Sequence, residues 1–452
     1  MSLPNKIPRA PGNLPLVGHA LQLLRDPFTF LNSLPAQGDM VQIRIGPLSA
    51  IMLCNPALTR QVLVNDRLFD KGGPFYERMR ESVGDALFTC PHDQHRQQRR
   101  MAQPAFHRAR FPGYAQTMTM QSVALAKGWR HGQVLNVAAE MSALTMAVAV
   151  ETMFSDALTP QAVQNTIEDI ETVAKGILRR AVVPAVLNRL STLSTRRYQR
   201  ASARLRQTIA PVIADRRASN VDRGDLLSAL LAARDTDDSH HEVDRRFTDT
   251  ELLDQAVTFL ATGTETTANT LAWALHLLAR HPEIEERLHG ELDAVLAGAP
   301  AQYEDLPKLS FTTRIIVESL RLYPIAWIFT RTTTEDTTLG GHHIPAGSMV
   351  AVSPYLIQHR SDLYESPERF DPDRWDAEIH PPPPREAFTA FGGGARKCIG
   401  DEFSIAEATI ALATICALWH MESIPGQGPR PKASIALSPH ELRLRANRRQ
   451  HA

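Results

Sequence analysis

One cysteine near the C-terminus lies in a setting suited to chemistry. Cys398 belongs to the run F-G-G-G-A-R-K-C-I-G at residues 391–400, with Arg396 and Lys397 just before it. Glycines lack a Cβ, so the backbone can turn tightly and approach a flat ligand closely. Neighbouring positive charge favours a thiolate, which is a soft ligand for iron. We therefore expect Cys398 to ligate a metal. The alternative is a buried structural cysteine, the usual role of a lone cysteine.

A second group of polar side chains lies inside an apolar stretch. Residues 251–280 have the pattern of one long helix capped by Thr248, and the centre of this helix reads T-G-T-E-T-T. A carboxylate such as Glu265 is costly within so apolar a helix unless it is used. The alternative is a helix bend in which the threonine hydroxyls bond to backbone carbonyls.

Together the two motifs resemble those of the cytochrome P450 family. The family's heme-ligand motif, F-x-x-G-x-R-x-C-x-G, is matched at every fixed position, and its oxygen-activation motif, A/G-G-x-D/E-T-T/S, is matched from Gly263 onward. The resemblance implies heme b (iron protoporphyrin IX) ligated by Cys398, with Phe391 and Arg396 in the cofactor site. It also implies proton delivery to bound O2, with Glu265 as the acid and Thr266 as the alcohol.

Further cationic residues are candidates to hold the cofactor. His95 and Arg99 match a family spacing in which both contact a heme propionate, and one helical turn places them on the same face. The resemblance puts Arg331 on a propionate as well, and a guanidinium matches a carboxylate well. A solvated basic helix face is the alternative for His95 and Arg99.

A structural ion network is also implied by the resemblance. Glu318 and Arg321 form the family's E-x-x-R pair, which joins an arginine of a downstream F-x-P-x-R-W segment. That segment reads F-D-P-D-R-W here, so Arg374 is the expected third member, and Arg369 is the second choice. This network would brace the heme loop without taking part in the chemistry.

The candidate substrate contacts are nearly all apolar. They are Phe75, Tyr76, Met79, Thr262, Ala326, Trp327 and Ile328. Thr262 stands where the family usually has Ala or Gly, and the first three residues could instead simply pack under their loop. An apolar pocket suits a hydrocarbon, and several runs near the N-terminus resemble bacterial sesquiterpene-oxidising P450 members. We therefore expect a terpene of secondary metabolism, with a fatty acid or a steroid as the alternative.

Composition narrows the class of protein. The 452 residues are 43% hydrophobic and carry 49 Lys plus Arg against 49 Asp plus Glu. A nucleic-acid binder would show a basic excess. The four cysteines are scattered without a CxxC pair, which favours a reducing compartment. No uncharged apolar run is long enough for a signal peptide or a membrane span. We expect a cytoplasmic protein without a membrane anchor.

The expected fold is mainly α with a small β-rich part, namely the cytochrome P450 fold in a single domain over residues 1–452. The β-rich part covers about residues 35–60, with a hairpin at 40–56, together with strands at about 325–355. Residues 69–86 read as an irregular loop, 159–217 as helices with a break around 183–195, 325–331 as a strand and 401–419 as a helix.

The expected function is that of a heme-thiolate monooxygenase, which inserts one oxygen atom of O2 into a C–H bond. The chain leaves no room for a flavin domain after the heme loop, so we expect electrons from ferredoxin and ferredoxin reductase. Arg96, Arg100 and Lys397 are candidates for a docking patch. A heme-based sensor would not need an acid–alcohol pair. A peroxide-driven enzyme would place an arginine on the long helix, where none occurs between Glu251 and Arg280.

Overall fold

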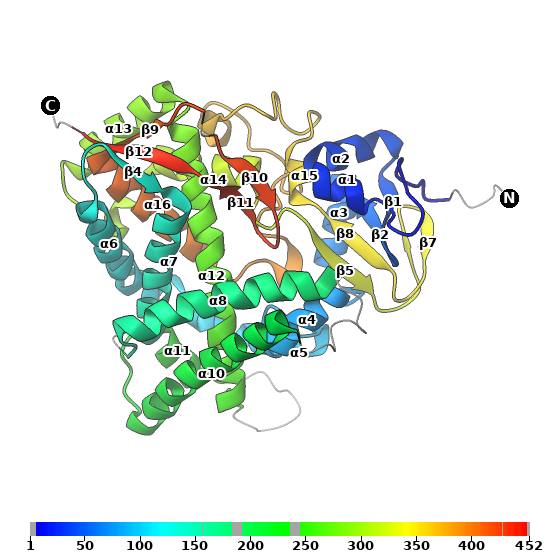
Figure 1. Cartoon of the computed structure of the whole chain (residues 1–452), viewed down its shortest axis with the longest axis horizontal. Helices are drawn as coiled ribbons and strands as arrows, with labels where there is room; N and C mark the ends of the chain where they lie inside the picture. Colours follow the sequence, from blue (N-terminus) through cyan, green and yellow to red (C-terminus); the bar gives the residue numbers. More distant parts are fainter. Residues whose placement is uncertain (1–5, 156, 183–191, 236–244, 427, 450–452) are drawn as a thin grey trace. The chain divides into compact units, whose positions relative to one another are not determined.

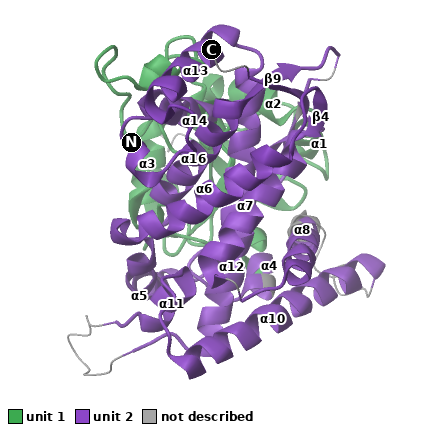
Figure 2. Ribbon diagram, turned by 90° about the vertical axis from the view of Figure 1, so that its left-hand side faces the viewer, with its two compact units in different colours: residues 1–77, 320–398 green, residues 78–319, 399–452 purple. Residues whose placement is uncertain are grey.

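The computed structural model describes residues 6–449 except 156, 183–191, 236–244 and 427. The chain forms two compact units, and each is built from two segments (Figure 2). Unit 1 comprises residues 1–77 and 320–398, and unit 2 comprises 78–319 and 399–452. The single-domain organisation expected from the sequence stays a prediction.

Unit 1 is organised around a five-stranded sheet of order β1-β2-β8-β5-β3. The predicted hairpin is confirmed as β1 (Met40–Ile45) and β2 (Leu48–Leu53), which pair in antiparallel register around a turn with Gly46 at positive φ. β2 then pairs in parallel with β8 (Met349–Val352). Antiparallel pairing adds β5 (Phe329–Thr333) and β3 (Phe69–Asp70).

Helix α3 (Pro56–Val64) covers this sheet. Asn55 caps the helix by accepting hydrogen bonds from two backbone N–H groups, and Pro56 occupies the first turn, where no N–H is needed. Buried apolar side chains of α3, β1, β2, β3 and β8 form one core cluster. The smaller elements of unit 1 are α1 (Ala20–Arg25), α2 (Pro27–Ser33), η1 (Leu34–Gln37), β6 (Thr337–Leu339), β7 (His342–Ile344), α15 (Pro354–Gln358), η5 (Pro372–Trp375) and η6 (Gly394–Arg396).

Unit 2 is mainly helical, and its longest helix is α12 (Asp249–Leu278, Figure 1). The predicted Thr248 cap is confirmed as a capping box with Glu251. α12 packs along α7 (Val137–Phe154), α10 (Leu193–Ser219) and α16 (Asp401–Leu418). The other helices are α5 (His92–Ala102), η2 (Gln103–Phe106), η3 (Arg108–Arg110), α6 (Phe111–Gly128), α8 (Pro160–Val182), α11 (Leu226–Ala232), α13 (Pro282–Leu296) and η4 (Tyr303–Asp305).

Two helices belong to both units because the chain crosses between the units within them. α4 (Pro74–Val83) begins in unit 1 and ends in unit 2, and α14 (Ser310–Leu322) runs from unit 2 into unit 1. Of the break predicted around residues 183–195, residues 183–191 lie outside the described residues, and α10 already begins at Leu193.

Three sequence expectations are wrong in detail. Residues 69–86 are not an irregular loop, because β3 and α4 form within them and Pro74 opens a run of good helix formers. The strand expected at 325–331 begins only at Phe329, after Pro324 and bends at residues 325 and 326. Unit 2 also has strands that the sequence reading missed. One is β4 (Gln133–Asn136), and the others lie near the C-terminus: β9 (Trp419–Ser423), β10 (Arg430–Ala433), β11 (Leu437–His440) and β12 (Arg443–Arg448).

Among the described residues, one helix has the length and apolar composition of a membrane span. This helix is α7, and 56% of its residues are buried. It packs along α12. The core helix of a globular protein passes the same length and hydropathy criteria.

Candidate active site

The cysteine loop is held in unit 1 by its own backbone and by contact with α3. Cys398 N donates to the Phe391 carbonyl at 3.0 Å, and Lys397 N donates to the Gly394 carbonyl at 3.1 Å. Gly394 has φ +64°, and a Cβ added there would lie 2.1 Å from the Leu63 carbonyl oxygen. Only glycine fits so close an approach. The sequence argument expected these glycines to let a flat ligand approach, whereas the close approach at Gly394 is to the backbone of α3.

Exposure separates Cys398 from the other three cysteines. None of the four forms a disulfide bond, and Cys54, Cys90 and Cys416 are buried whereas Cys398 is exposed. Burial raises the pKa of the Cys54 thiol to about 12 and raises that of Cys416 as well. Buried thiols of this kind stay protonated and inert. Cys398 is therefore the cysteine that is placed to act as a ligand.

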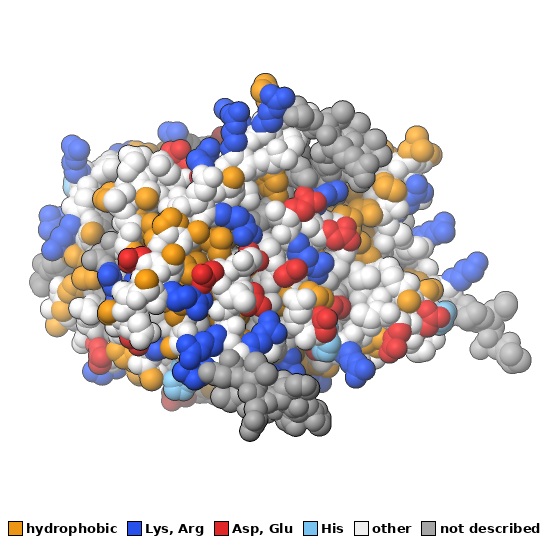
Figure 3. Space-filling view, turned by 90° about the horizontal axis from the view of Figure 1, so that it is seen from below, with side chains coloured by type: hydrophobic (Ala, Val, Ile, Leu, Met, Phe, Trp, Pro, Cys, Tyr) orange, Lys and Arg blue, Asp and Glu red, His pale blue; other side chains and the backbone are white. Residues whose placement is uncertain are grey.

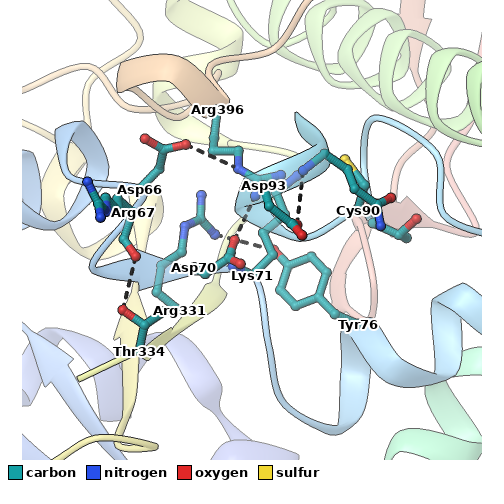
Figure 4. A network of polar contacts seen from close by, with 12 residues as sticks. Asp66, Arg67, Asp70, Lys71, Tyr76, Cys90, Asp93, Arg331, Thr334 and Arg396 are labelled. Atoms are coloured by element: carbon teal, nitrogen blue, oxygen red, sulfur yellow. Dashed lines mark hydrogen bonds and ion pairs between the residues drawn. The ribbon is translucent and has the colours of Figure 1, made fainter. Parts of the chain in front are cut away.

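Arg396 of the cysteine loop belongs to an ionic cluster in unit 1 (Figure 4). The side chain of Arg396 is 1% exposed, and its guanidinium lies 2.6 Å from Asp70 Oδ1 and 3.5 Å from Asp66 Oδ2. Sequence reasoning missed both carboxylates, because they lie in a segment of mixed charge with no motif. Arg396 thus ties the cysteine loop to the chain before and within β3.

Arg331 in the same unit has no carboxylate partner among the described residues. It is 4% exposed, and it donates to the Thr330 carbonyl at 2.9 Å and to Tyr76 Oη at 3.4 Å. A buried guanidinium with only neutral acceptors is costly, and an added carboxylate would offset that cost. This arrangement fits the propionate of a heme, as the sequence motif implied.

Two members of the expected ion network, Arg321 and Arg374, lie over the ring of Tyr364. Glu318 and Arg321 on α14 are both fully buried. Arg321 donates to the backbone carbonyls of Gln358 at 2.9 Å and Arg369 at 3.1 Å. Its guanidinium lies 5.1 Å from the Tyr364 ring centroid, and that of Arg374 lies 5.7 Å from the same ring. The guanidinium groups of Arg321 and Arg374 therefore both contact the Tyr364 ring. Arg369 contributes its backbone carbonyl, which accepts a hydrogen bond from Arg321.

The middle turn of α12 carries several polar side chains within a mostly buried helix. Gly263 and Thr266 are exposed although most of the helix is buried, and a Cβ added at Gly263 would meet no atom within 4 Å. Thr266 Oγ1 donates to the Thr262 carbonyl at 2.8 Å, and Thr262 Oγ1 donates to the Thr258 carbonyl at 2.8 Å. The helix remains α throughout. A flat ligand can therefore approach the backbone at this turn.

Glu265 on this turn has the environment of a proton donor. It is half-buried, and burial raises the pKa of its carboxyl, with Glu171 of α8 adding to the rise and Lys175 opposing it. A carboxyl group with a raised pKa gives up and regains a proton closer to neutral pH. Glu265 and Thr266 are adjacent in sequence, so the acid and the alcohol lie on the same turn.

The remaining predicted cofactor contacts are on α5. His95 is 3% exposed and Arg99 is half-buried. They are four residues apart within one helix, so they share a face. The alternative of a solvated basic face does not suit a buried histidine. Arg100 on the same helix is paired with Asp235, with its Nη2 3.1 Å from Oδ2, so its charge is already balanced.

The predicted substrate residues differ in exposure. Tyr76 is 2% exposed, and its hydroxyl accepts from Arg331. Met79 is 7% exposed, and Trp327 packs edge-on against Phe28 of the same unit. These three side chains pack within the fold, which for Tyr76 and Met79 is the alternative interpretation of the sequence. Ala326 is exposed, whereas Phe75, Thr262 and Ile328 are half-buried.

Sequence reasoning also missed a buried acid in unit 2. Glu407 lies on α16 and is 3% exposed, and burial raises the pKa of its carboxyl group to about 8. The signal was present, since Glu407 is the one carboxylate in the apolar run A-E-A-T-I-A-L-A. The argument that singled out Glu265 applies to it equally.

Comparison with known proteins agrees with these features. The family model for cytochrome P450 matches residues 8–445. The chain is 46% identical over 441 residues to pentalenene oxygenase of Streptomyces avermitilis, covering 97% of each chain. It is 45% identical over 437 residues to cyclooctatin synthase of Streptomyces melanosporofaciens, covering 96% of this chain and 94% of that protein.

A third relative and a solved structure extend the likeness. Cyclooctat-9-en-7-ol 5-monooxygenase of Streptomyces melanosporofaciens is 43% identical over 418 residues, covering 92% of this chain and 90% of that protein. The crystal structure of a cytochrome P450DA heme domain matches with a TM-score of 0.88 and 27% identity over 98% of both chains. A matching sequence model, fold and thiolate loop lead to one conclusion: the chain belongs to the cytochrome P450 family and is a heme-dependent monooxygenase.

Proposed function

We propose that this P450 monooxygenase oxidises a terpene hydrocarbon or terpene alcohol of secondary metabolism, with sesquiterpenes as the first class to test. The observation that carries the proposal is 43–46% identity over nearly the full chain to three enzymes, which are named for pentalenene, cyclooctatin and cyclooctat-9-en-7-ol. The apolar character of Ala326 and Ile328 suits such a substrate.

The proposed cofactor is heme b, ligated by Cys398. Heme supplies the iron that binds and activates O2. The role of the loop is to present one exposed thiolate, because η6 and the Cys398–Phe391 backbone bond fix its position. Arg331 would hold a propionate, since it is buried without a carboxylate partner among the described residues. His95 and Arg99 are proposed to hold a propionate from α5. Arg396 is proposed to brace the loop, because two carboxylates already engage its guanidinium.

Proton delivery is assigned to the middle turn of α12. Because the Thr266 hydroxyl proton is bound to the Thr262 carbonyl, the lone pairs of Thr266 Oγ1 remain free to accept a hydrogen bond. Glu265 has a raised pKa and can therefore donate a proton and be recharged near neutral pH. The hydroxyl of Thr262 donates to the Thr258 carbonyl of the same helix. Relative to the Ala or Gly usual at this position, Thr262 therefore adds a methyl group but no free hydrogen-bond donor.

Electrons are proposed to come from ferredoxin and ferredoxin reductase. Arg96 and Lys397 are exposed, whereas Arg100 is neutralised by Asp235. On the face shown in Figure 3, Lys and Arg side chains are interspersed with Asp and Glu side chains. Arg96→Ala is expected to slow reduction by ferredoxin at low salt. Arg25→Ala removes another exposed cation as the control. If both variants slow reduction by ferredoxin equally, Arg96 has no specific role in docking.

A spin-state titration tests the substrate class. Purified ferric holoprotein is titrated with a sesquiterpene hydrocarbon, a terpene alcohol, a steroid and a fatty acid, and the low-spin to high-spin change is recorded. A saturable shift with a terpene, followed by a product one oxygen atom heavier in a ferredoxin-driven assay, supports the proposal. A shift with only the steroid or only the fatty acid would refute the terpene proposal and leave the monooxygenase assignment intact.

A further inference from the structure

The N-terminal part of unit 1 gathers most of the exposed large apolar side chains. Among the described residues, seven such side chains, each at least 36% exposed, lie between residues 14 and 48, and six others are scattered from Val64 to Ile379. The turn at residues 14–18 contributes Leu14, Leu16 and Val17, α1 contributes Leu21 and Leu24, and the β1–β2 hairpin contributes Ile45 and Leu48. We call these seven residues the N-terminal apolar patch. Single exposed apolar side chains are ordinary, whereas a group of them marks an interaction site.

Backbone contacts make the turn, the hairpin and α1 neighbours on unit 1. Gly18 N donates to the Leu14 carbonyl at 3.0 Å and closes the turn at residues 14–18. The turn lies against the hairpin, because Gly46 N donates to the Val17 carbonyl at 3.0 Å. α1 begins two residues after Gly18. Its two exposed leucines are three residues apart and therefore share one face of the helix.

Leu16 is presented to solvent by a costly backbone conformation. Its φ is +64° and its side chain is 83% exposed. Positive φ is uncommon for residues other than Gly, Asn and Asp, and no burial of the leucine side chain offsets the cost here. A strained residue that holds an apolar side chain in water points to a function at that position.

The charge around the N-terminal apolar patch is positive. Residues 6–50 contain four cations and two acids, and all six are exposed. The cations are Lys6, Arg9, Arg25 and Arg44. Within the described chain none of them has a carboxylate partner, and the two that form hydrogen bonds, Arg9 and Arg44, donate to neutral oxygens. Of the two acids, Asp26 already caps α2, which leaves Asp39 as the other negative charge.

We propose that the N-terminal apolar patch docks this protein peripherally on a bilayer that contains anionic lipid. The exposed leucines enter the boundary between headgroups and acyl chains, and the four cations meet the lipid phosphates. Stable but reversible attachment needs both signals, because either one alone binds weakly. The proposal goes beyond the proposed function, since it holds for any substrate.

Charge decides between this surface and a second copy of the chain. A symmetric dimer formed through the same patch would place the four cations of one protomer near those of its partner. Like charges repel, whereas an anionic bilayer complements them. The apolar side chains suit both occupants, so the cations carry the choice of a lipid surface.

Vesicle flotation of the purified holoprotein tests the proposal. One set of vesicles contains equal parts of phosphatidylglycerol and phosphatidylcholine, and the other contains phosphatidylcholine alone. The protein should float with the anionic vesicles, more weakly with the neutral ones, and less with the anionic vesicles as salt is added. Absence of binding, or equal binding to both vesicles at every salt concentration, would overturn the proposal.

Matched variants locate the contact. Leu16→Asp and Leu24→Asp replace exposed leucines, and Asp tolerates the positive φ at position 16. Each should weaken binding to anionic vesicles by about tenfold. Leu193→Asp is the control, because Leu193 is 82% exposed on α10 of unit 2. An equal loss in Leu193→Asp, or full binding in both other variants, would refute the assignment to this patch.

Two further measurements separate the lipid surface from other occupants. Arg25→Ala and Arg44→Ala should each weaken binding to anionic vesicles by about fivefold and leave binding to neutral vesicles unchanged. Equal effects on both vesicles would contradict the role of charge. Sedimentation velocity should show no dimer that Leu16→Asp or Leu24→Asp dissociates. Such a dimer would assign the patch to a second copy of the chain and overturn the proposal.

Discussion

Replacing Gly394 by alanine should disable the cysteine loop, whereas the same change at Gly392 should be tolerated. Both glycines have positive φ, +64° and +72°, where an L-residue costs about 1–2 kcal/mol. A Cβ at Gly392 meets nothing within 4 Å. A Cβ at Gly394 would lie 2.1 Å from the Leu63 carbonyl oxygen and 2.8 Å from Val64 Cα.

The two variants therefore separate backbone strain from overlap. Real Cβ atoms essentially never come within 3.0 Å of another heavy atom, so α3 and the loop must move apart in Gly394→Ala. The overlapping atoms belong to the backbone and cannot change rotamer. Overlap of this kind adds about 1–3 kcal/mol to the cost of the positive φ. Gly392→Ala should cost only about 1–2 kcal/mol.

The assay is thermal unfolding together with heme content and the carbon monoxide spectrum of the reduced protein. Gly394→Ala should lower the melting temperature further than Gly392→Ala and should lose most of the thiolate-type spectrum. Gly392→Ala should keep that spectrum. Equal losses in both variants would show that strain alone, and not the contact with α3, shapes the loop.

Three further outcomes follow from the same geometry. Thr266→Ala should uncouple the enzyme, giving peroxide in place of product, and full coupling would remove Thr266 from proton delivery. Arg321→Ala should destabilise the fold by about 3–5 kcal/mol, since two buried carbonyls lose a charged donor. Arg369→Ala keeps its carbonyl and should cost far less, so equal losses in chemical denaturation would refute this role of Arg321. Folded Glu407, with its pKa raised from 4.5 to about 8, keeps a proton that the unfolded chain releases. Wild-type stability should therefore fall relative to Glu407→Gln by about 1.4 kcal/mol per pH unit between those values, and parallel stability curves would contradict the burial argument.

Motifs with a strict physical reason were predictable from the sequence. The loop around Cys398 needs a glycine at position 394. The capping box needs a hydroxyl at Thr248 and an acid three residues later. Both features can be recognised in the sequence without a structure. Hairpin β1–β2 likewise followed from alternation and a Gly-Pro turn. These features depend on residues close together in the chain.

Features that depend on distant residues could not be predicted. Nothing in the sequence says that Arg396 meets Asp66 and Asp70, since 326 residues separate the loop from Asp70. The strands of unit 2 are short and pair across the chain, as Leu444 does with Leu135, so their local pattern is weak. The burial of Glu407 likewise depends on the packing of α16 against distant elements such as α12, although the acid itself was visible in the sequence.

The most direct test of the central claim is the carbon monoxide spectrum of the reduced holoprotein for the wild type, Cys398→Ser and Cys54→Ala. The account predicts the thiolate-type band in the wild type, its loss in Cys398→Ser, and its retention when buried Cys54 is replaced. A wild type that binds heme without this band, or a Cys398→Ser variant that keeps it, would contradict the assignment of Cys398 as the iron ligand.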